Sequence, residues 1–188
     1  RLPLTIRAVP EGAVLPTRNP LCRVWNTGGK ITRGLTTWIE TPLLRSTWYM
    51  SSVATTSWHI RELIGDYYDK AVDDGRNDPG FNFRLHDFGS RGVSSLDSAQ
   101  MGGAAHLLTG WMGTDTYVAV PFLVDHYRAN PAATAFSIPA MEHSTVTSWG
   151  REGERDAVLN MIRNYGREGG LLAAVGDSYN IFEFTQMC

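Results

Sequence analysis

The chain has 188 residues, 43% of them hydrophobic, which is enough for one good domain or two small ones with a buried core. Its formal charge of −2 argues against a surface that grips nucleic acid or anionic lipid, because such surfaces need clustered Lys and Arg. With Cys22 and Cys188 as the only cysteines, thiols can build neither a disulfide framework nor a zinc site. No apolar run reaches membrane-spanning length and no signal-peptide pattern opens the chain, so we expect a cytoplasmic protein without nucleic-acid or membrane partners.

The N-terminal region, residues 1–80, is predicted to be a small mixed domain of strands and helices. Short alternating apolar runs at residues 2–9 and 12–26 are separated by Pro, Gly and Asn, which predicts antiparallel strands. Residues 35–72 carry apolar and aromatic side chains at helical spacing, and we expect two helices there, with Pro42 near the start of one or bending it. The Asp, Asn, Gly and Pro cluster at residues 73–80 is the best candidate boundary.

After this boundary, residues 81–188 alternate between extended and helical patterns. The expected strands are residues 81–88, 105–111, 134–140 and 170–177, and the expected helices are residues 94–104, 115–129, 153–166 and 178–186. Such alternation predicts a parallel sheet with right-handed crossovers, either open and doubly wound or closed as a barrel. Four units cannot close an eight-stranded barrel.

Residues that could form a site lie at or just after the carboxyl end of each expected strand. In strand order they are His86, Asp87, Phe88 and Arg91; Thr114 and Asp115; Glu142 and His143; Asp177 and Ser178. Each acidic or hydroxyl residue taken singly could simply cap the following helix. Because the carboxyl ends of parallel strands meet at one edge, where α/β enzymes bind ligands, the four sets together favour a shared site.

Four motifs at these ends carry a family resemblance: "RLHDFGSRGVSS" (84–95), "GTDT" (113–116), "SIPAMEHSTVTSWG" (137–150) and "GDSYNI" (176–181). In this order and spacing they resemble the nicotinamide phosphoribosyltransferases, type II phosphoribosyltransferases of NAD salvage. The upstream "LPLTIRAVPEGAVLPTRNPL" and "TTWIETPLL" resemble the same family. The resemblance implies half of an α/β (TIM-like) barrel, preceded by a smaller mixed β-strand and helix region.

The resemblance also implies a reaction. Nicotinamide and phosphoribosyl pyrophosphate give nicotinamide mononucleotide and pyrophosphate, with Mg²⁺ and with ATP hydrolysis coupled through a phosphorylated histidine. Arg91 is the candidate for binding phosphate, since a guanidinium offers a planar fork to phosphate oxygens. Phe88 resembles the aromatic residue that stacks on the pyridine ring, although it could also be an ordinary core residue at a strand end.

Asp115 is the most discriminating residue of the chain. A carboxylate beside the 3-substituent of the pyridine ring accepts a hydrogen bond from the amide of nicotinamide but repels the carboxylate of nicotinic acid. The charge of Asp115 therefore selects nicotinamide.

His143 is the residue expected to be phosphorylated. A neutral imidazole is a competent nucleophile near neutral pH, and a neighbouring carboxylate can fix its tautomer. The sequence leaves open whether Asp177 or Glu142 orients the ring.

Three further residues have weaker assignments. Ser137 and Ile138 resemble residues that line the nicotinamide tunnel of the family, and His86 is expected at its rear mouth, but all three could equally be packing residues. His59, His106 and His126 lie on helical or apolar stretches outside the motifs, so we expect structural roles for them. No metal ligand is assigned.

The phosphate-binding parts of the family's second half do not occur in this sequence, which begins with Arg rather than Met. We therefore expect a portion of a longer polypeptide, or a chain whose barrel a second chain completes, and no turnover by this chain alone. Family members are homodimers with active sites at the subunit interface. The alternatives are a nicotinate phosphoribosyltransferase, against which Asp115 argues, and a non-catalytic fragment that acts as a binding module.

Overall fold

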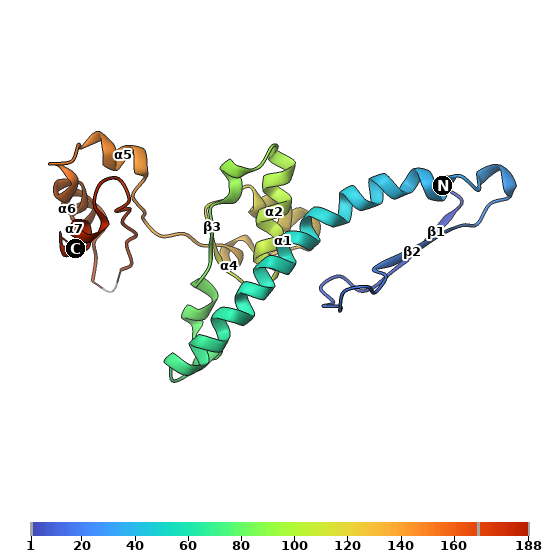
Figure 1. The fold of residues 1–188 in the computed structure, drawn as a ribbon, viewed down its shortest axis with the longest axis horizontal. Coiled ribbons are helices and arrows are strands. Elements are labelled where there is room, and N and C mark those ends of the chain that lie inside the picture. The colour runs from blue at the N-terminus through green and yellow to red at the C-terminus, as the bar shows by residue number, and fades with distance from the viewer. Residues whose placement is uncertain (1, 169, 188) are drawn as a thin grey trace.

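The computed structural model describes residues 2–168 and 170–187. A long helix connects an N-terminal hairpin to a helical middle region, and three C-terminal helices lie at the end opposite the hairpin (Figure 1). The elements in chain order are β1 (Leu4–Ala8), β2 (Cys22–Asn26), η1 (Lys30–Thr32), α1 (Leu35–Ala71), η2 (Gly75–Asn77), η3 (Pro79–Phe83), β3 (His86–Asp87), η4 (Gly89–Gly92), α2 (Leu96–Leu108), β4 (Gly113–Thr114), α3 (Ala119–Tyr127), α4 (Pro131–Thr134), α5 (His143–Ser148), α6 (Glu154–Tyr165) and α7 (Ile181–Met187).

The antiparallel strands predicted at the N-terminus are confirmed. β1 pairs with β2 in a register that sets Leu4 opposite Asn26 and Ala8 opposite Cys22. The loop between the two strands reaches α3, where the Tyr127 hydroxyl donates a hydrogen bond to the Glu11 carboxylate. The hairpin is therefore tied to the middle of the molecule as well as to α1.

The prediction of two helices over residues 35–72 is wrong, because α1 is a single helix of 37 residues that contains Pro42. Proline removes one backbone donor from a helix, which kinks or weakens it without always ending it. The middle of α1 packs against α2, as the contacts of Tyr49 with Gly102 and of Ser57 with His106 show, and this packing stabilises the helix beyond the proline.

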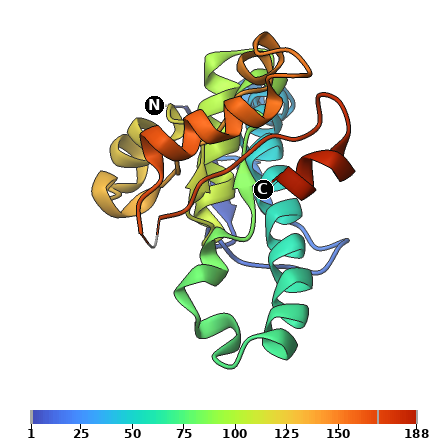
Figure 2. The same cartoon turned by 90° about the vertical axis from the view of Figure 1, so that its left-hand side faces the viewer.

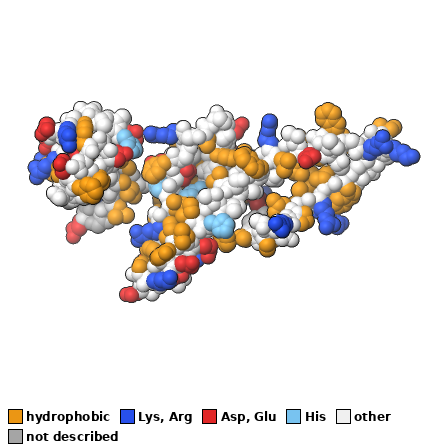
Figure 3. All heavy atoms as spheres, viewed as in Figure 1, with side chains coloured by type: hydrophobic (Ala, Val, Ile, Leu, Met, Phe, Trp, Pro, Cys, Tyr) orange, Lys and Arg blue, Asp and Glu red, His pale blue; other side chains and the backbone are white. Residues whose placement is uncertain are grey.

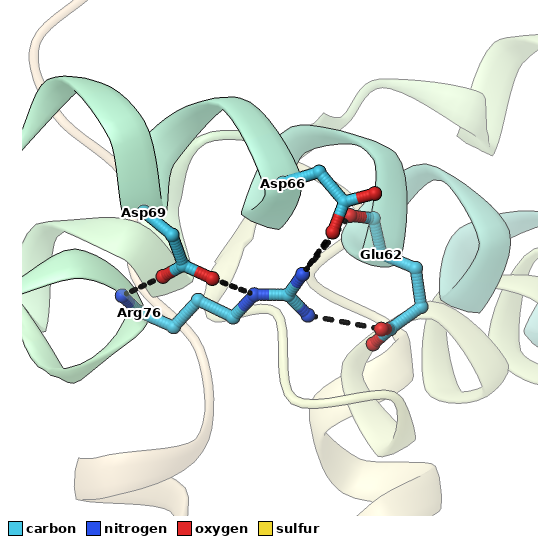
Figure 4. Close-up of polar contacts among 4 residues, drawn as sticks. All are labelled: Glu62, Asp66, Asp69 and Arg76. Carbon is cyan, nitrogen blue, oxygen red and sulfur yellow. Dashed lines mark hydrogen bonds and ion pairs between the residues drawn. The ribbon is translucent and has the colours of Figure 1, made fainter.

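The candidate boundary segment, residues 73–80, folds back onto α1 through one arginine. The Arg76 guanidinium contacts three carboxylates of α1: Glu62 at 2.9 Å, Asp66 at 2.7 Å and Asp69 at 2.8 Å (Figure 4). A Cβ at Gly65 would lie 2.3 Å from the guanidinium carbon of Arg76, so only glycine at position 65 leaves room for the Arg76 side chain against α1. Whether a domain boundary falls near residue 80 stays a prediction.

Small residues let the middle helices approach closely. A side chain at Gly103 of α2 would come within 2.7 Å of the Ala119 Cβ on α3, and one at Gly102 within 2.9 Å of the Tyr49 hydroxyl on α1. The resulting core consists of Ala104, Leu107, Ala119 and Leu123. α2 also contacts β4, which pairs with β3, and the candidate site lies at the ends of these two strands.

Parallel pairing is present, but the strands are much shorter than expected. β3 pairs in parallel with β4, Gly113 also bridges Phe136, and Ala140 bridges Ala173. The expected strand at residues 81–88 is reduced because Asp78 accepts from the Gly80 N–H and starts η3. The expected strand at 105–111 is wrong because α2 continues to Leu108 with Thr109 as its C-cap. Gly110 follows this cap with a φ of +91°, which suits glycine.

The four helices expected after residue 81 are confirmed as α2, α3, α6 and α7, with somewhat different ends. α4 and α5 are additional helices that the sequence did not predict. Figure 2 views the molecule from the end formed by α5, α6 and α7, which pack against one another. The observed fold is thus a mixture of helices and short sheets.

The surface is large for the mass of the chain and carries many exposed apolar side chains. The chain exposes 13563 Å², whereas a compact monomer of 20.8 kDa exposes about 8,900 Å². Figure 3 shows hydrophobic side chains at the surface over α1 and the hairpin, and Trp38 of α1 is 81% exposed. Apolar surface of this extent marks contact sites for other parts of a protein or other chains.

Candidate active site

Asp87 shapes the turn from which the site is built. Its Oδ1 accepts a hydrogen bond from the Gly89 N–H at 2.8 Å, and its Oδ2 accepts one from the Thr114 hydroxyl at 3.0 Å. The backbone N–H of Asp115 donates to the Asp87 carbonyl at 2.8 Å. Asp87 thus joins the ends of β3 and β4, and both of its carboxylate oxygens accept hydrogen bonds from other residues of the protein.

Four predicted residues meet beside this junction, and we call His86, Phe88, Asp115 and Ser137 the Asp115 cluster. The Asp115 Oδ1 accepts from the Ser137 hydroxyl at 2.6 Å and lies 2.9 Å from the His86 Nε2. The Phe88 ring lies against the His86 ring, with 4.6 Å between centroids. No described residue hydrogen-bonds to the other carboxylate oxygen, Oδ2, which is therefore available to a ligand.

Asp115 is held in its ionised form. Burial raises the pKa of the carboxyl group, but the hydrogen bonds from Ser137 and His86, together with the charge of His86, outweigh burial and lower this pKa below its usual value. The Asp115 carboxylate is therefore negatively charged at neutral pH.

The remaining strand ends form a second group, Arg91, Glu142, His143 and Asp177, which we call the His143 cluster. The His143 Nε2 lies 3.3 Å from the Asp177 Oδ2, whereas its Nδ1 lies 3.9 Å from the Glu142 Oε1. The Arg91 guanidinium is 3.6 Å from the same Glu142 oxygen. All four side chains are largely accessible to solvent.

The structure thus brings eight of the nine predicted site residues into two clusters, and the Arg91 to Glu142 contact links η4 to the residue before α5. Ile138 directly follows Ser137 and is 41% exposed. Its role in lining a tunnel stays a prediction, as do the roles of the other eight.

The sequence did not predict that His106 lies close to the candidate site. It is buried at the end of α2 and contacts Gly113, two residues before Asp115. Gly110 could have indicated this position, because glycine often follows the end of a helix. A helix that ends just before Gly110 has His106 in its last turn, facing the next strand.

A cavity of about 250 Å³ lies beside the Asp115 cluster. β3 and η4 line one side of it, with His86 and Phe88, while α1 and α2 line the other, with Ser57 and His106. Among the described residues, no group of three His, Cys, Asp or Glu side chains could hold a metal ion.

Residues 83–186 match the model of the nicotinate phosphoribosyltransferase (NAPRTase) family. This match covers more than half of the chain and includes both clusters, and the chain belongs to that family.

Three curated relatives extend the likeness over nearly the whole chain, and each is named nicotinamide phosphoribosyltransferase. The protein of Xanthomonas campestris pv. campestris is 47% identical over 182 residues, which cover 97% of this chain and 37% of the relative. The protein of Acinetobacter baylyi is 32% identical over 96% of this chain and 34% of the relative. The protein of Mycoplasma pneumoniae is 28% identical over 97% of this chain and 37% of the relative. The chain therefore spans little more than a third of the length of these relatives.

Of the helices in the described part of the chain, none combines the length and the apolar character needed to cross a membrane.

Proposed function

We propose that this chain carries the nicotinamide-binding and phosphohistidine parts of a nicotinamide phosphoribosyltransferase, which makes nicotinamide mononucleotide and pyrophosphate from nicotinamide and phosphoribosyl pyrophosphate. The observation that carries the proposal is the Asp115 cluster: an ionised carboxylate with one oxygen bonded by the protein and the other available, beside an exposed phenylalanine ring.

In this proposal the Asp115 Oδ2 accepts a hydrogen bond from the amide NH₂ of nicotinamide. The carboxylate of nicotinate would instead meet a negative charge and have no proton to donate. The Phe88 ring, 63% exposed, has a face available for stacking on the pyridine ring, while His86 supports its other side. Ser137 and His86 hold the carboxylate in place.

The chemical step joins two groups that the enzyme holds in line. The pyridine nitrogen forms a bond to C1 of the ribose as the bond from C1 to the pyrophosphate oxygen breaks, and pyrophosphate leaves with the electron pair. Arg91, at the end of η4, is the proposed partner for a phosphate group.

ATP coupling is proposed to run through His143. A proton on Nε2, facing Asp177, would leave the Nδ1 lone pair free to attack the γ-phosphorus of ATP, so that a nitrogen–phosphorus bond forms and ADP leaves. The shorter distance to Asp177 favours Asp177 over Glu142 as the orienting carboxylate.

Magnesium is proposed on the family resemblance alone. The described residues bring together no group of three His, Cys, Asp or Glu side chains, and Mg²⁺ in enzymes that act on phosphates is held by substrate phosphates, water and only one or two carboxylates. We therefore assign Mg²⁺ no ligand in this chain and no step of the reaction.

The full enzyme is proposed to be a cytoplasmic homodimer built around an α/β barrel, of which residues 81–188 of this chain form the first half. The parallel pairing of β3 with β4, of Gly113 with Phe136 and of Ala140 with Ala173 supports consecutive strands of one sheet. The large apolar surface supports burial against the second half of the barrel and a partner subunit.

The test uses the protein at its full natural length, supplied with phosphoribosyl pyrophosphate, ATP and Mg²⁺. Nicotinamide and nicotinate are compared side by side by chromatography of the mononucleotide products. We expect product from nicotinamide and little from nicotinate. Equal turnover of both, or turnover of nicotinate alone, would contradict the proposal, and binding without turnover would indicate a non-catalytic protein.

A further inference from the structure

We propose that His106 is a positioning residue for Asp115: from the end of α2 it holds the first residue of β4 and thereby sets where the Asp115 carboxylate stands. This inference rests on the proposed function, since it assigns to His106 a role in nicotinamide recognition.

The two ring nitrogens of His106 have different partners. Nε2 lies 3.2 Å from the Gly113 carbonyl oxygen, and because a carbonyl only accepts, the ring proton must be on Nε2. Nδ1 is then the acceptor, and the Ser57 hydroxyl of α1 faces it at 3.4 Å. One imidazole therefore connects α1, α2 and β4.

Burial keeps this imidazole neutral. Only 5% of His106 is exposed, and burial lowers the pKa of the ring, outweighing the opposing effect of Asp87 and of the Gly113 carbonyl, while His86 lowers it further. The Trp111 ring lies nearly parallel to the imidazole, with 11° between planes, and its indole N–H donates to the Ser57 carbonyl at 3.2 Å. The ring is thus fixed in both orientation and tautomer.

Gly113 passes this constraint to the Asp115 cluster by two routes. Along the chain, Gly113 and Thr114 form β4 and Asp115 follows directly. Across the sheet, Gly113 pairs with His86 so closely that a Cβ would lie 2.6 Å from the His86 Nδ1. The other nitrogen of His86 lies 2.9 Å from Asp115. A shift of Gly113 therefore moves both the backbone of Asp115 and the imidazole that orients its carboxylate.

The test compares His106→Leu and His106→Gln in the full-length protein. Leu fills the space without a donor, whereas the Gln amide can still donate to the Gly113 carbonyl. We expect His106→Leu to raise the KM for nicotinamide about tenfold, as displacement of a positioned group does, with the KM for phosphoribosyl pyrophosphate unchanged. His106→Gln should stay close to wild type. His126→Leu, which removes an exposed histidine of α3, is the control.

Several outcomes would overturn the inference. They are an unchanged nicotinamide KM in His106→Leu, an equal rise of both KM values, or a folded His106→Gln as impaired as His106→Leu. If His106→Leu does not fold, Ser57→Ala replaces it and must raise the same KM in the same direction. A wild type that makes no mononucleotide from nicotinamide overturns the proposed function instead, whatever the variants do. As a readout separate from activity, the ¹⁵N shifts of His106 in the wild type must be those of a neutral ring with its proton on Nε2.

Discussion

At the scale of single residues, the candidate site depends on which carboxylate oxygens accept hydrogen bonds from the protein and which do not. Both oxygens of Asp87 bond to the protein, to Gly89 and Thr114, and the residue stabilises a turn. Asp115 uses one oxygen for Ser137 and His86 and keeps the other available among the described residues. The two aspartates, joined by a backbone hydrogen bond, therefore differ in how many of their carboxylate oxygens the protein occupies. A carboxylate whose oxygens already accept hydrogen bonds has little capacity left for a ligand.

Asp115→Asn should weaken the preference for nicotinamide. A hydrogen bond to a charged group contributes about 1.5–3 kcal/mol, so kcat/KM for nicotinamide should fall at least about tenfold, while that for nicotinate rises because the repulsion is gone. The measurement is kcat/KM for both substrates with the full-length protein. Asp125→Asn, an exposed carboxylate of α3, is the control and should leave the ratio unchanged. An unaltered ratio in Asp115→Asn would refute the role of Asp115.

His143→Gln should abolish phosphorylation of the protein by γ-labelled ATP, since an amide nitrogen is not a nucleophile of this kind. Asp177→Asn should slow labelling, because the nearest group that orients the ring loses its charge, and Glu142→Gln should have the smaller effect because it lies farther away. Acid-labile label retained on the protein is the readout. Labelling of His143→Gln at the wild-type rate would show that another residue is phosphorylated.

At the scale of elements, two sets of side-chain contacts connect loops to helices. Arg76 attaches the segment after α1 to three carboxylates of that helix, and Tyr127 of α3 is bonded to Glu11 in the hairpin loop. Each contact connects parts of the chain that local propensity alone would leave independent.

Arg76→Ala should lower the melting temperature, because Glu62, Asp66 and Asp69 would then repel one another along α1. Arg76→Lys should recover only part of the loss, since an ammonium group cannot reach three carboxylates with a planar fork. Melting is followed by circular dichroism, with Arg45→Ala on the same helix as control. If both alanine variants melt at the same temperature, the Arg76 contacts contribute nothing.

Tyr127 should make stability depend on alkaline pH. Burial, together with the hydrogen bond to Glu11, raises the pKa of Tyr127 from its ordinary value of 10.0 to about 12 in the folded state. The folded protein therefore keeps a proton that the unfolded chain loses, so this contribution to stability is complete below about pH 10 and is lost as the pH rises toward 12. Denaturant unfolding at rising pH should show this loss in the wild type but not in Tyr127→Phe. Tyr117→Phe, on an exposed tyrosine, should behave as the wild type does.

At the scale of the whole molecule, the chain exposes 13563 Å², about half as much again as a compact protein of its mass. Residues 1–188 expressed alone should therefore associate and bind a hydrophobic dye, whereas the full-length protein should bind far less. Light scattering after gel filtration and dye fluorescence are the measurements. Trp38→Ser should reduce dye binding by the isolated chain. A monodisperse monomer without dye binding would contradict this view of the surface.

Much of the organisation could be predicted from local patterns. Alternating apolar residues indicated the hairpin, and helical spacing indicated α2, α3, α6 and α7, because both signals depend on neighbours in the sequence. The strand lengths could not be predicted, since the apolar residues at 105–108 fit a helix and a strand equally well. The prediction of two helices around Pro42 was wrong for a related reason. The helical hydrogen bond that proline removes can be read from the local sequence, whereas the packing of α1 on α2, which outweighs this loss, cannot.

By itself, the sequence determined which motifs carry the candidate residues and in what order they follow one another, because motifs and turn signals are properties of adjacent residues. Only the tertiary structure decided which atoms meet. His86 and Asp115 are 29 positions apart, and Ser137 and Asp115 are 22 apart. The same holds for the distance from His143 to Asp177, which is shorter than its distance to Glu142, and for the burial of His106 against Gly113. These contacts depend on helix packing and sheet register, which act between segments that spacing along the chain cannot relate.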